Sequence, residues 1–186
     1  GTLGESSVLS WEEKFRLIVS ATKAVNYKLP VIMGIAENTT REAIAFAKEC
    51  DTAGADGFML LPPMRYHSDE KETVRYLNRV ADATDRPVML YNNPLGYKIM
   101  ITPAMFRELA ANQHFQAIKE SSGDVRYLTE LINEFGERYK ILSGVDDLAM
   151  ESLVMGADGW VAGLVCAFPH ETVAINNLVA AGRIEE

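Results

Sequence analysis

Short hydrophobic runs alternate with longer amphipathic stretches from one end of the chain to the other. Each run is continuously hydrophobic, as expected for strands of a parallel sheet that is buried on both faces by helices. The stretches between the runs predict helices, so the chain is expected to repeat a strand–helix unit. The predicted strands span residues 31–36, 57–61, 88–91, 115–119, 141–143 and 160–164.

Helix start and stop signals lie at several of the predicted boundaries. Ser10 with Glu13, and Thr39 with Glu42, have the spacing of capping boxes. Thr102 precedes a proline, which predicts an N-cap followed by proline at the first helical position. A Gly-Ala-Asp-Gly sequence occurs twice and is predicted to end a helix with a left-handed glycine before a tight turn. Shared turn chemistry is enough to explain this repeat.

Repeated strand–helix units predict a parallel α/β fold, either an open doubly wound sheet or a closed barrel. No GxGxxG sequence follows the first strand, which argues against an open sheet that binds a dinucleotide. Units of about 25–30 residues suit a (β/α)8 TIM barrel, and a complete one needs about 250 residues. The chain has 186 residues, so we expect residues 1–186 to form a partial TIM-barrel catalytic domain with about six strands.

The chain is acidic, with a formal charge of −8 at pH 7 and a pI near 5.0. It has no basic stripe to bind phosphates, which argues against a nucleic-acid partner. It has neither a hydrophobic run of the roughly 18 residues that a membrane span requires nor a signal-peptide pattern. We therefore expect a cytoplasmic protein without a membrane partner. Cys50 and Cys166 lie far apart among apolar residues and are predicted to be buried thiols.

No metal or other cofactor is expected from the sequence. His67, His114 and His170 lie far apart without ligand spacing and are predicted to be surface or loop residues. Asp146 and Asp147 follow a predicted strand and could bind a cation, but acidic residues are also favourable at a helix N-terminus. The chain contains neither a P-loop nor a GxSxG sequence.

Lys119 ends a predicted strand and is the most informative residue of the chain. Strands disfavour lysine, and an ammonium group is rarely buried unless it is paired. At the C-terminal end of a barrel strand, the side chain would enter the catalytic mouth. Desolvation there lowers the pKa of the amine and frees it to attack a carbonyl. The alternative is a lysine at the rim that pairs with Glu120.

Tyr91 ends the preceding predicted strand, so its phenol is expected beside Lys119 at the same end of the sheet. A phenol there can relay protons to and from a carbinolamine. The alternative is a core tyrosine before an Asn-Pro turn. The glycine-rich residues 1–6 precede a helix, and their N–H groups could hold a carboxylate with the help of the helix dipole. Any strand–helix turn can have a similar sequence.

Together these segments resemble the dihydrodipicolinate synthase / N-acetylneuraminate lyase family. That family has a GTTGE-type loop, a YN-x-P segment and a K-E segment in this order and at this spacing. The matching segments here are 1–5, 91–94 and 118–120, and residues 143–144 and 159–163 match as well. The resemblance covers essentially the whole chain.

The resemblance implies a lyase or aldolase in which Lys119 forms a Schiff base with pyruvate or a related 2-oxo acid. Tyr91 would shuttle protons, with the Thr2 hydroxyl as the next member of the relay. The backbone at Leu3 and Val161 would hold the substrate. The imine itself would act as the electron sink, so the family chemistry implies no cofactor.

The family fold is a (β/α)8 barrel followed by a small helical domain. By this resemblance the chain begins at the end of the second strand and stops in the helix after the eighth. The first strand, most of the second and the C-terminal helices would be missing, and such a fragment is expected to be inactive and poorly soluble. The family also implies a homo-oligomer, a tetramer, for the full-length protein.

Three positions depart from the family pattern and concern substrate recognition. Leu3 replaces a threonine, so a hydroxyl contact is lost while the N–H group remains. Gly96 stands where the synthases carry an arginine that binds the carboxylate of the second substrate. Arg65, with Tyr66 beside it, stands where they place a tyrosine contributed across a subunit contact, and either residue could take over that role.

Gly96 therefore predicts that the full-length protein is not a lysine-pathway synthase. Residues 92–94 and 167–169 resemble the hydroxyproline-pathway deaminases, which act on pyrroline-4-hydroxy-2-carboxylate. A non-catalytic barrel that binds a small acid is an alternative from another class, and the presence of Lys119 and Tyr91 argues against it. The absent phosphate loop argues against an open-sheet nucleotide-binding protein.

Overall fold

The computed structural model describes residues 4–63 and 66–186. Its centre is one parallel sheet of six strands in the order β1-β2-β3-β4-β5-β6, so each strand pairs with the next one along the chain. This order is the one expected for a barrel wall. The strands are β1 (Ile32–Ile35), β2 (Gly57–Leu60), β3 (Val88–Asn92), β4 (Phe115–Glu120), β5 (Lys140–Ser143) and β6 (Gly159–Trp160).

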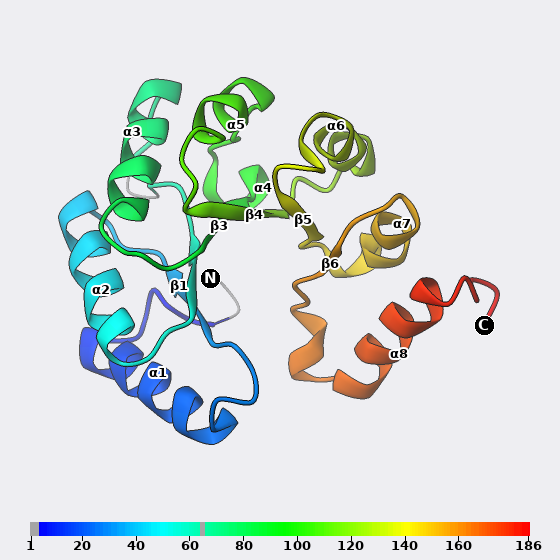
Figure 1. The fold of residues 1–186 in the computed structure, drawn as a ribbon, viewed down its shortest axis with the longest axis horizontal. Coiled ribbons are helices and arrows are strands. Elements are labelled where there is room, and N and C mark those ends of the chain that lie inside the picture. The colour runs from blue at the N-terminus through cyan, green and yellow to red at the C-terminus, as the bar shows by residue number, and fades with distance from the viewer. Residues whose placement is uncertain (1–3, 64–65) are drawn as a thin grey trace.

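Helices lie along the convex side of the curled sheet and follow one another in an arc from α1 to α8 (Figure 1). In the described chain the arc stays open between these two helices (Figure 1). The prediction of an incomplete (β/α) barrel is confirmed. The helices are α1 (Trp11–Val25), α2 (Thr40–Thr52), α3 (Glu70–Ala81), α4 (Pro94–Tyr97), α5 (Pro103–Leu109), α6 (Val125–Phe135), α7 (Ala149–Val154) and α8 (Pro169–Ala180), with 3-10 turns η1 (Asp146–Leu148) and η2 (Leu164–Cys166).

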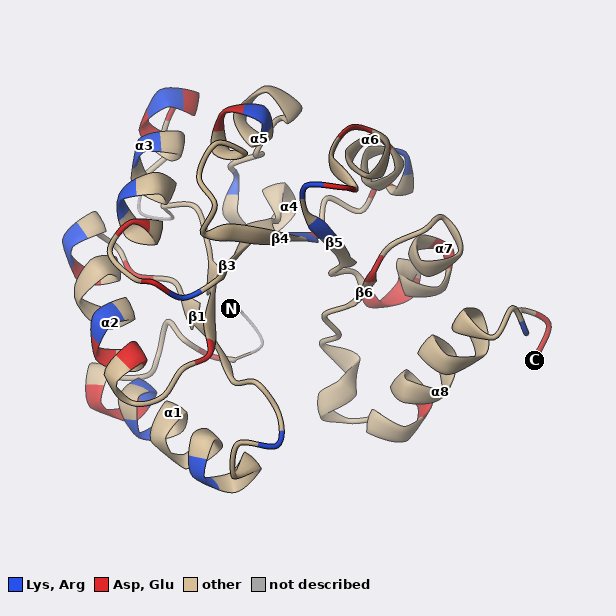
Figure 2. Cartoon of the chain, viewed as in Figure 1, with Lys and Arg blue, Asp and Glu red and all other residues tan. Residues whose placement is uncertain are grey.

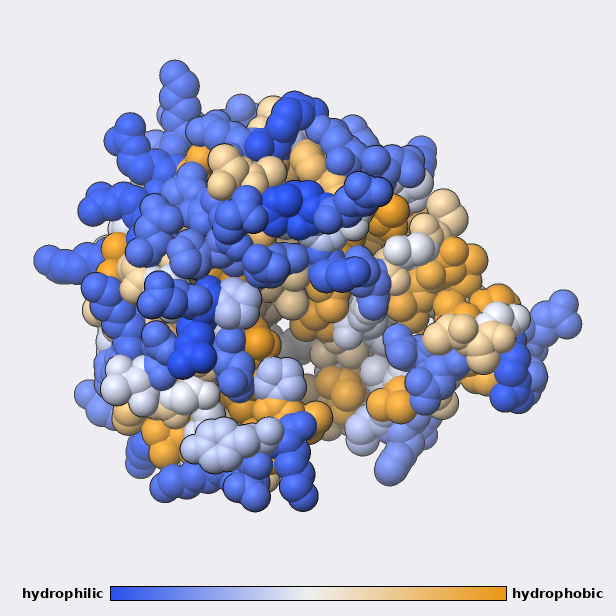
Figure 3. Space-filling model, viewed as in Figure 1, coloured by the Kyte–Doolittle hydropathy of each residue, from blue (hydrophilic) through white to orange (hydrophobic). Residues whose placement is uncertain are grey.

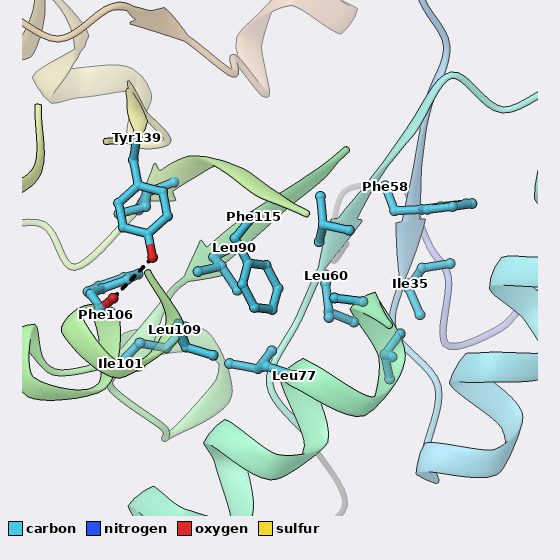
Figure 4. Packing of buried hydrophobic residues seen from close by; sticks show 14 of the residues in the cluster. Ile35, Phe58, Leu60, Leu77, Leu90, Ile101, Phe106, Leu109, Phe115 and Tyr139 are labelled. Carbon is cyan, nitrogen blue, oxygen red and sulfur yellow. Dashed lines mark hydrogen bonds between the residues drawn. The ribbon is translucent and has the colours of Figure 1, made fainter. Parts of the chain in front are cut away.

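The strand residues that face the helices form the core. Because side chains alternate between the two faces of a sheet, register partners share a face. Figure 4 shows Leu77 of α3 and Leu109 of α5 packing toward strand residues of this outward row. Five register partners, one from each of β1–β5, are completely buried there: Ile35, Leu60, Leu90, Ile118 and Ile141.

The opposite, concave face of the sheet is less buried than the sequence predicted. The register partners Met59 and Met89 are half-buried, and Lys140 farther along the same row is exposed. The expectation that the strands are covered on both faces is therefore wrong for this chain. No helix of the described residues crosses the concave side, and the molecule is hollowed there, with hydrophobic surface at the rim (Figure 3).

The sixth strand is much shorter than the predicted 160–164. Only Gly159–Trp160 is a strand, and a 3-10 turn occupies Leu164–Cys166. The Asp146 side chain accepts hydrogen bonds from the N–H groups of Gly163 and Leu164, each at 2.9 Å. Since these groups bond to a carboxylate, they do not extend the ladder with β5, and the strand ends early.

The predicted helix starts are confirmed with one difference. Ser10 and Glu13 form a complete capping box, and Thr102 caps α5 with proline at the start of the helix. Thr39 accepts a hydrogen bond from the Glu42 N–H, as predicted. The Glu42 carboxylate, however, accepts from the Thr39 hydroxyl at 2.9 Å, so only half of this box has the predicted form.

The two Gly-Ala-Asp-Gly sequences make the predicted helix endings. Gly54 and Gly156 follow α2 and α7 with φ angles of +98° and +105°, a region that glycine adopts without steric cost. Gly57, which opens β2, has a different constraint. A Cβ atom there would lie 2.9 Å from both Ile32 Cδ1 and the Pro87 carbonyl oxygen.

The two cysteines differ in burial. Cys50 in α2 is buried, as predicted, and burial raises the pKa of its thiol to about 12. Cys166 is exposed, so the prediction of a second buried thiol is wrong. It lies in the 3-10 turn that replaces the end of the predicted sixth strand, and this turn leaves the sheet.

Charged side chains of both signs are mixed along the outer helices α1–α3, whereas α8 is almost uncharged (Figure 2). Among the described residues, no helix combines the length and the apolar character needed to cross a membrane.

Candidate functional site

Lys119 and Tyr91 face each other from neighbouring strands. They are register partners in the β3–β4 ladder, on the face opposite to Leu90 and Ile118. The Lys119 Nζ atom lies 4.1 Å from the centroid of the Tyr91 ring. The structure thus brings together the two side chains that the sequence selected, at the carboxyl ends of two parallel strands.

A β-bulge sets this pairing. Val88 pairs with Phe115, but Met89 pairs with Ala117, so β4 has one extra residue at this point. If the register of Val88 with Phe115 continued without the bulge, Tyr91 would pair with Ile118 and Lys119 would face away from it. The bulge therefore decides that the amine and the phenol share a face.

The environment of Lys119 makes its amine easier to deprotonate than the amine of a solvated lysine. The side chain is half-buried, and burial lowers the pKa of its amine. Attraction by Tyr97 and Asp146 opposes this effect but does not cancel it. The alternative of a rim ion pair with Glu120 is not observed, because Glu120 lies on the opposite face and hydrogen-bonds Asn92.

The loop after β3 holds the Tyr91 phenol. Tyr91 is 7% exposed, and its hydroxyl accepts a hydrogen bond from Asn93 Nδ2 at 3.1 Å. The Asn93 side-chain oxygen accepts from the Gly96 N–H at 2.9 Å and so caps α4. The Tyr97 ring packs edge-on against Tyr91, with 5.5 Å between the ring centroids. The Asn-Pro turn thus orients the phenol.

Gly144 makes room for the lysine. It follows β5, and its N–H donates to the Glu120 carbonyl at 2.8 Å. A Cβ atom on Gly144 would overlap the Ser121 hydroxyl and lie 2.7 Å from Lys119 Cε. The Lys119 side chain therefore passes directly over this backbone, which explains why a glycine occupies the position.

Sequence reasoning missed the role of Asp146. Its carboxylate accepts from Trp160 Nε1 at 3.1 Å and from two N–H groups of the following loop. It thereby holds the chain after β6, where Val161 lies, and its charge attracts the Lys119 ammonium. The available signal was an acidic residue three positions after one strand, together with a glycine inside the next predicted strand.

A cavity of about 520 Å³ lies near the carboxyl ends of β1 and β2. Its lining includes Gly96 and Tyr97, so it adjoins the loop that holds Tyr91. Lys14 and Glu37 also line it and form an ion pair of 2.9 Å, with side chains 10% and 11% exposed. This buried pair was not predicted, because neither residue belongs to a recognisable motif.

The other predicted site residues are only partly described by the structure. Thr2, Leu3 and Arg65 lie outside the described residues. Tyr66 is 56% exposed. Val161 is half-buried, and its N–H donates to the Ser143 carbonyl at 2.8 Å, which continues the β5–β6 pairing by one residue.

The described part of the glycine-rich segment does not lead directly into a helix. Residues 4–8 form turns, Glu5 has a φ of 53°, and α1 begins only at Trp11. The dipole of α1 thus begins several residues beyond the glycines. The predicted help from a helix dipole is not supported at these residues.

The histidines lie at the surface, as predicted: His67 and His170 are exposed and His114 is half-buried. Within residues 4–63 and 66–186, no group of three or more His, Cys, Asp or Glu side chains is arranged to hold a metal ion.

The fold and the site define a class: a parallel α/β barrel wall that presents a desolvated amine beside a phenol at its carboxyl ends. A profile of the Dihydrodipicolinate synthetase family matches residues 1–186. The chain belongs to that family.

The relatives agree in sequence and in fold. A 4-hydroxy-tetrahydrodipicolinate synthase of Thermodesulfovibrio yellowstonii is 33% identical over 185 residues, which cover 100% of this chain and 64% of the relative. The pyruvate complex of the dihydrodipicolinate synthase of Acinetobacter baumannii superposes with a TM-score of 0.94 at 29% identity, covering 100% of this chain and 64% of that one. A catalytic lysine mutant of the Ruminococcus gnavus sialic acid aldolase superposes with a TM-score of 0.95 at 26% identity. The match covers 100% of this chain and 61% of the aldolase. The chain thus spans about 64% of the length of the curated relative it matches.

Proposed function

We propose that the full-length protein is a lyase or aldolase in which Lys119 forms a Schiff base with pyruvate or a related 2-oxo acid. One observation carries the proposal: a half-buried lysine with a lowered pKa lies 4.1 Å from the ring of an oriented tyrosine. Burial makes the Lys119 amine easier to deprotonate, and the neutral amine is the form that attacks a carbonyl carbon. A surface lysine would remain protonated.

The neutral Lys119 amine would add to the keto carbon, and a proton would move from nitrogen to oxygen to give the carbinolamine. Tyr91 would carry this proton, and Thr2, outside the described residues, would be its next partner. Loss of water then leaves the imine. The protonated imine withdraws electrons from the adjacent carbon and stabilises the enamine through which a C–C bond forms or breaks.

The comparisons support this proposal by analogy. One similar structure is a complex with pyruvate, and another carries a mutation of what its description calls the catalytic lysine. Val161 and the segment with Leu3 are proposed as backbone contacts to the substrate, and Arg65 or Tyr66 as a relay contributed across a subunit contact. A homotetramer remains a proposal on the same grounds.

The residue at position 96 bears on the identity of the second substrate. The curated relatives reported are synthases, which does not favour the deaminase alternative. Gly96 still offers no cation, and a Cβ atom there would lie 2.9 Å from Asn93 Nδ2, so the α4 cap occupies the space of a side chain. We therefore expect weak binding of a second substrate that depends on a carboxylate–cation contact at this position.

Borohydride trapping tests the proposal. Pyruvate plus borohydride should add one stable adduct to Lys119 of the full-length protein, and a Lys119→Arg variant should show none at that position. Lys140→Arg is a matched control, because Lys140 is an exposed lysine on the neighbouring strand. Labelling at another lysine, or no labelling with any 2-oxo acid, would exclude the assignment. Assays with pyruvate plus aspartate semialdehyde, beside cyclic imines and sugar acids, then identify the second substrate.

A further inference from the structure

Directly behind the Lys119–Tyr91 pair, the same two strands carry a buried polar pair. Asn92 and Glu120 are the next register partners along β3 and β4, and their side chains lie on the helix-facing side. Asn92 is 0% exposed and Glu120 is 4% exposed. Asn92 Nδ2 donates to Glu120 Oε2 at 2.7 Å. A side-chain hydrogen bond thus joins the two backbone segments that carry the amine and the phenol.

The hydrogen-bond partners show why a carboxylate stands at position 120. Asn92 Oδ1 accepts from the Ile101 N–H at 2.9 Å, so its amide must present N–H groups to Glu120. The second oxygen of Glu120 accepts from the Ser122 N–H. Glu120 is therefore surrounded by donors, so the side chain at position 120 must supply two acceptor atoms. A carboxylate supplies both, whereas a glutamine side chain supplies one acceptor and one donor group.

Burial raises the pKa of Glu120, and the hydrogen bonds from Ser122 and Asn92 act in the opposite direction. None of the ion pairs among the described residues includes Glu120. A buried polar group is tolerated when its hydrogen bonds are satisfied, and leaving one unsatisfied costs about 1–3 kcal/mol. The Asn92 amide and the Ser122 N–H therefore have to stay within hydrogen-bond distance of the Glu120 carboxylate.

The network also fixes the loop that holds the phenol. Ile101 closes the segment after β3, and its carbonyl accepts from the Tyr127 hydroxyl of α6 at 2.6 Å. The same segment contains Asn93, which donates to the Tyr91 hydroxyl, and Tyr97, which packs on its ring. Asn92 thus ties both ends of this loop to β3, and Glu120 ties Asn92 to β4.

We propose that Glu120 is a positioning residue: by accepting hydrogen bonds from Asn92 and from the Ser122 backbone, it holds the carboxyl ends of β3 and β4 so that the Lys119 amine and the Tyr91 phenol keep the separation needed for proton transfer. This inference rests on the proposed Schiff-base function. It assigns Glu120 no contact with substrate, because its side chain lies on the opposite face of the sheet from Lys119.

A donor–acceptor swap in the full-length protein tests it. Glu120→Gln keeps the size of the side chain but sets a donor against the Asn92 amide. The double variant Asn92→Asp/Glu120→Gln restores every bond, because an aspartate at 92 accepts from both Ile101 and the glutamine. Asn92→Asp alone sets two carboxylates against each other and should be the least stable variant. The readouts are kcat, KM, the pH profile of kcat/KM and the unfolding midpoint.

Misplacement of catalytic groups by about 1 Å can cost about 100-fold in rate. We expect Glu120→Gln to lower kcat about 10- to 100-fold, with a smaller change in KM and a shifted acid limb of the pH profile, when assayed well below its unfolding midpoint. The double variant should recover to within about threefold of the parent. If Glu120→Gln does not fold, the double variant alone decides the question. A folded double variant with near-parent kcat supports the inference, and a folded double variant with a low kcat overturns it.

Parent-like kcat and pH profile in a folded Glu120→Gln variant would also overturn the inference. Pyruvate–borohydride trapping on the parent separates this failure from that of the proposed function. An adduct at Lys119 with no effect of Glu120→Gln overturns only the positioning role. No adduct at Lys119 in the parent overturns both.

Discussion

The Lys119 amino group lies over the face of the Tyr91 ring, with Nζ 4.1 Å from the ring centroid. A cation is attracted to an aromatic face, which by itself favours the protonated amine. Burial acts in the opposite direction and is the largest influence on the pKa of Lys119, which is lowered. The balance leaves an amine that loses its proton more easily than a solvated lysine while the ring fixes its position.

Tyr91→Phe should leave the fold intact and slow turnover about 10²–10⁴-fold, the usual contribution of a general acid–base group. The substitution removes only the hydroxyl, and one side-chain donor, Asn93 Nδ2, loses its acceptor. Steady-state kinetics and a thermal melt measure the two effects. Tyr27→Phe is the control, because Tyr27 is 95% exposed. Activity of Tyr91→Phe within a few-fold of the parent would show that Tyr91 is structural.

Gly144→Ala should abolish imine formation, because the new methyl group would lie 2.7 Å from Lys119 Cε and overlap Ser121. The lysine would have to leave its position over the Tyr91 ring. Gly159→Ala is the matched control: among the described residues its Cβ would meet only Leu142 Cδ2, at 3.5 Å, an ordinary contact. Borohydride trapping measures both variants. Equal labelling of the two would contradict this account of Gly144.

Lys119→Met should raise the free energy of unfolding at neutral pH. Because the folded pKa of Lys119 is lowered from about 10.5, the unfolded chain binds more protons in the interval between the two pKa values. The cost of burying the charge is full below the folded pKa, and parent stability rises with pH until about 10.5. The gain from Lys119→Met should therefore shrink as pH rises. Denaturant unfolding at pH 7 and pH 10 tests this, and a gain that grows with pH would refute it.

Asp146→Ala should weaken both stability and substrate binding. It leaves the N–H groups of Gly163 and Leu164 without their acceptor, at a cost of about 0.5–1.5 kcal/mol each, because water can partly replace the carboxylate at these partly exposed positions. The chain around Val161 would loosen, so KM should rise more than kcat falls. Asp146→Asn keeps one acceptor oxygen and should have an intermediate effect. Kinetics and denaturant unfolding of both variants check the order, and equal effects would argue against the hydrogen-bonding role.

Local pattern predicted the elements well, and it failed where a distant side chain intervened. The strands that form the outward row are short hydrophobic runs, and their cover by helices follows from that composition. The sixth strand was overextended because Asp146, on a different strand–helix unit, takes up the N–H groups of Gly163 and Leu164. Cys166 was assigned to the interior because its sequence neighbours are apolar. In the structure these neighbours belong to an exposed 3-10 turn.

The sequence by itself determined that Lys119 and Tyr91 end consecutive strands, because hydrophobic runs and helix signals are local properties. Only the tertiary structure decided that they share a face. One extra residue between Phe115 and Ala117 shifts the register of β4 against β3. Because side chains alternate between the two faces of a strand, a shift of one residue moves every following side chain of β4 to the other face. The depressed pKa of Lys119 and the donor-only surroundings of Glu120 likewise depend on groups that meet only when the strands pair.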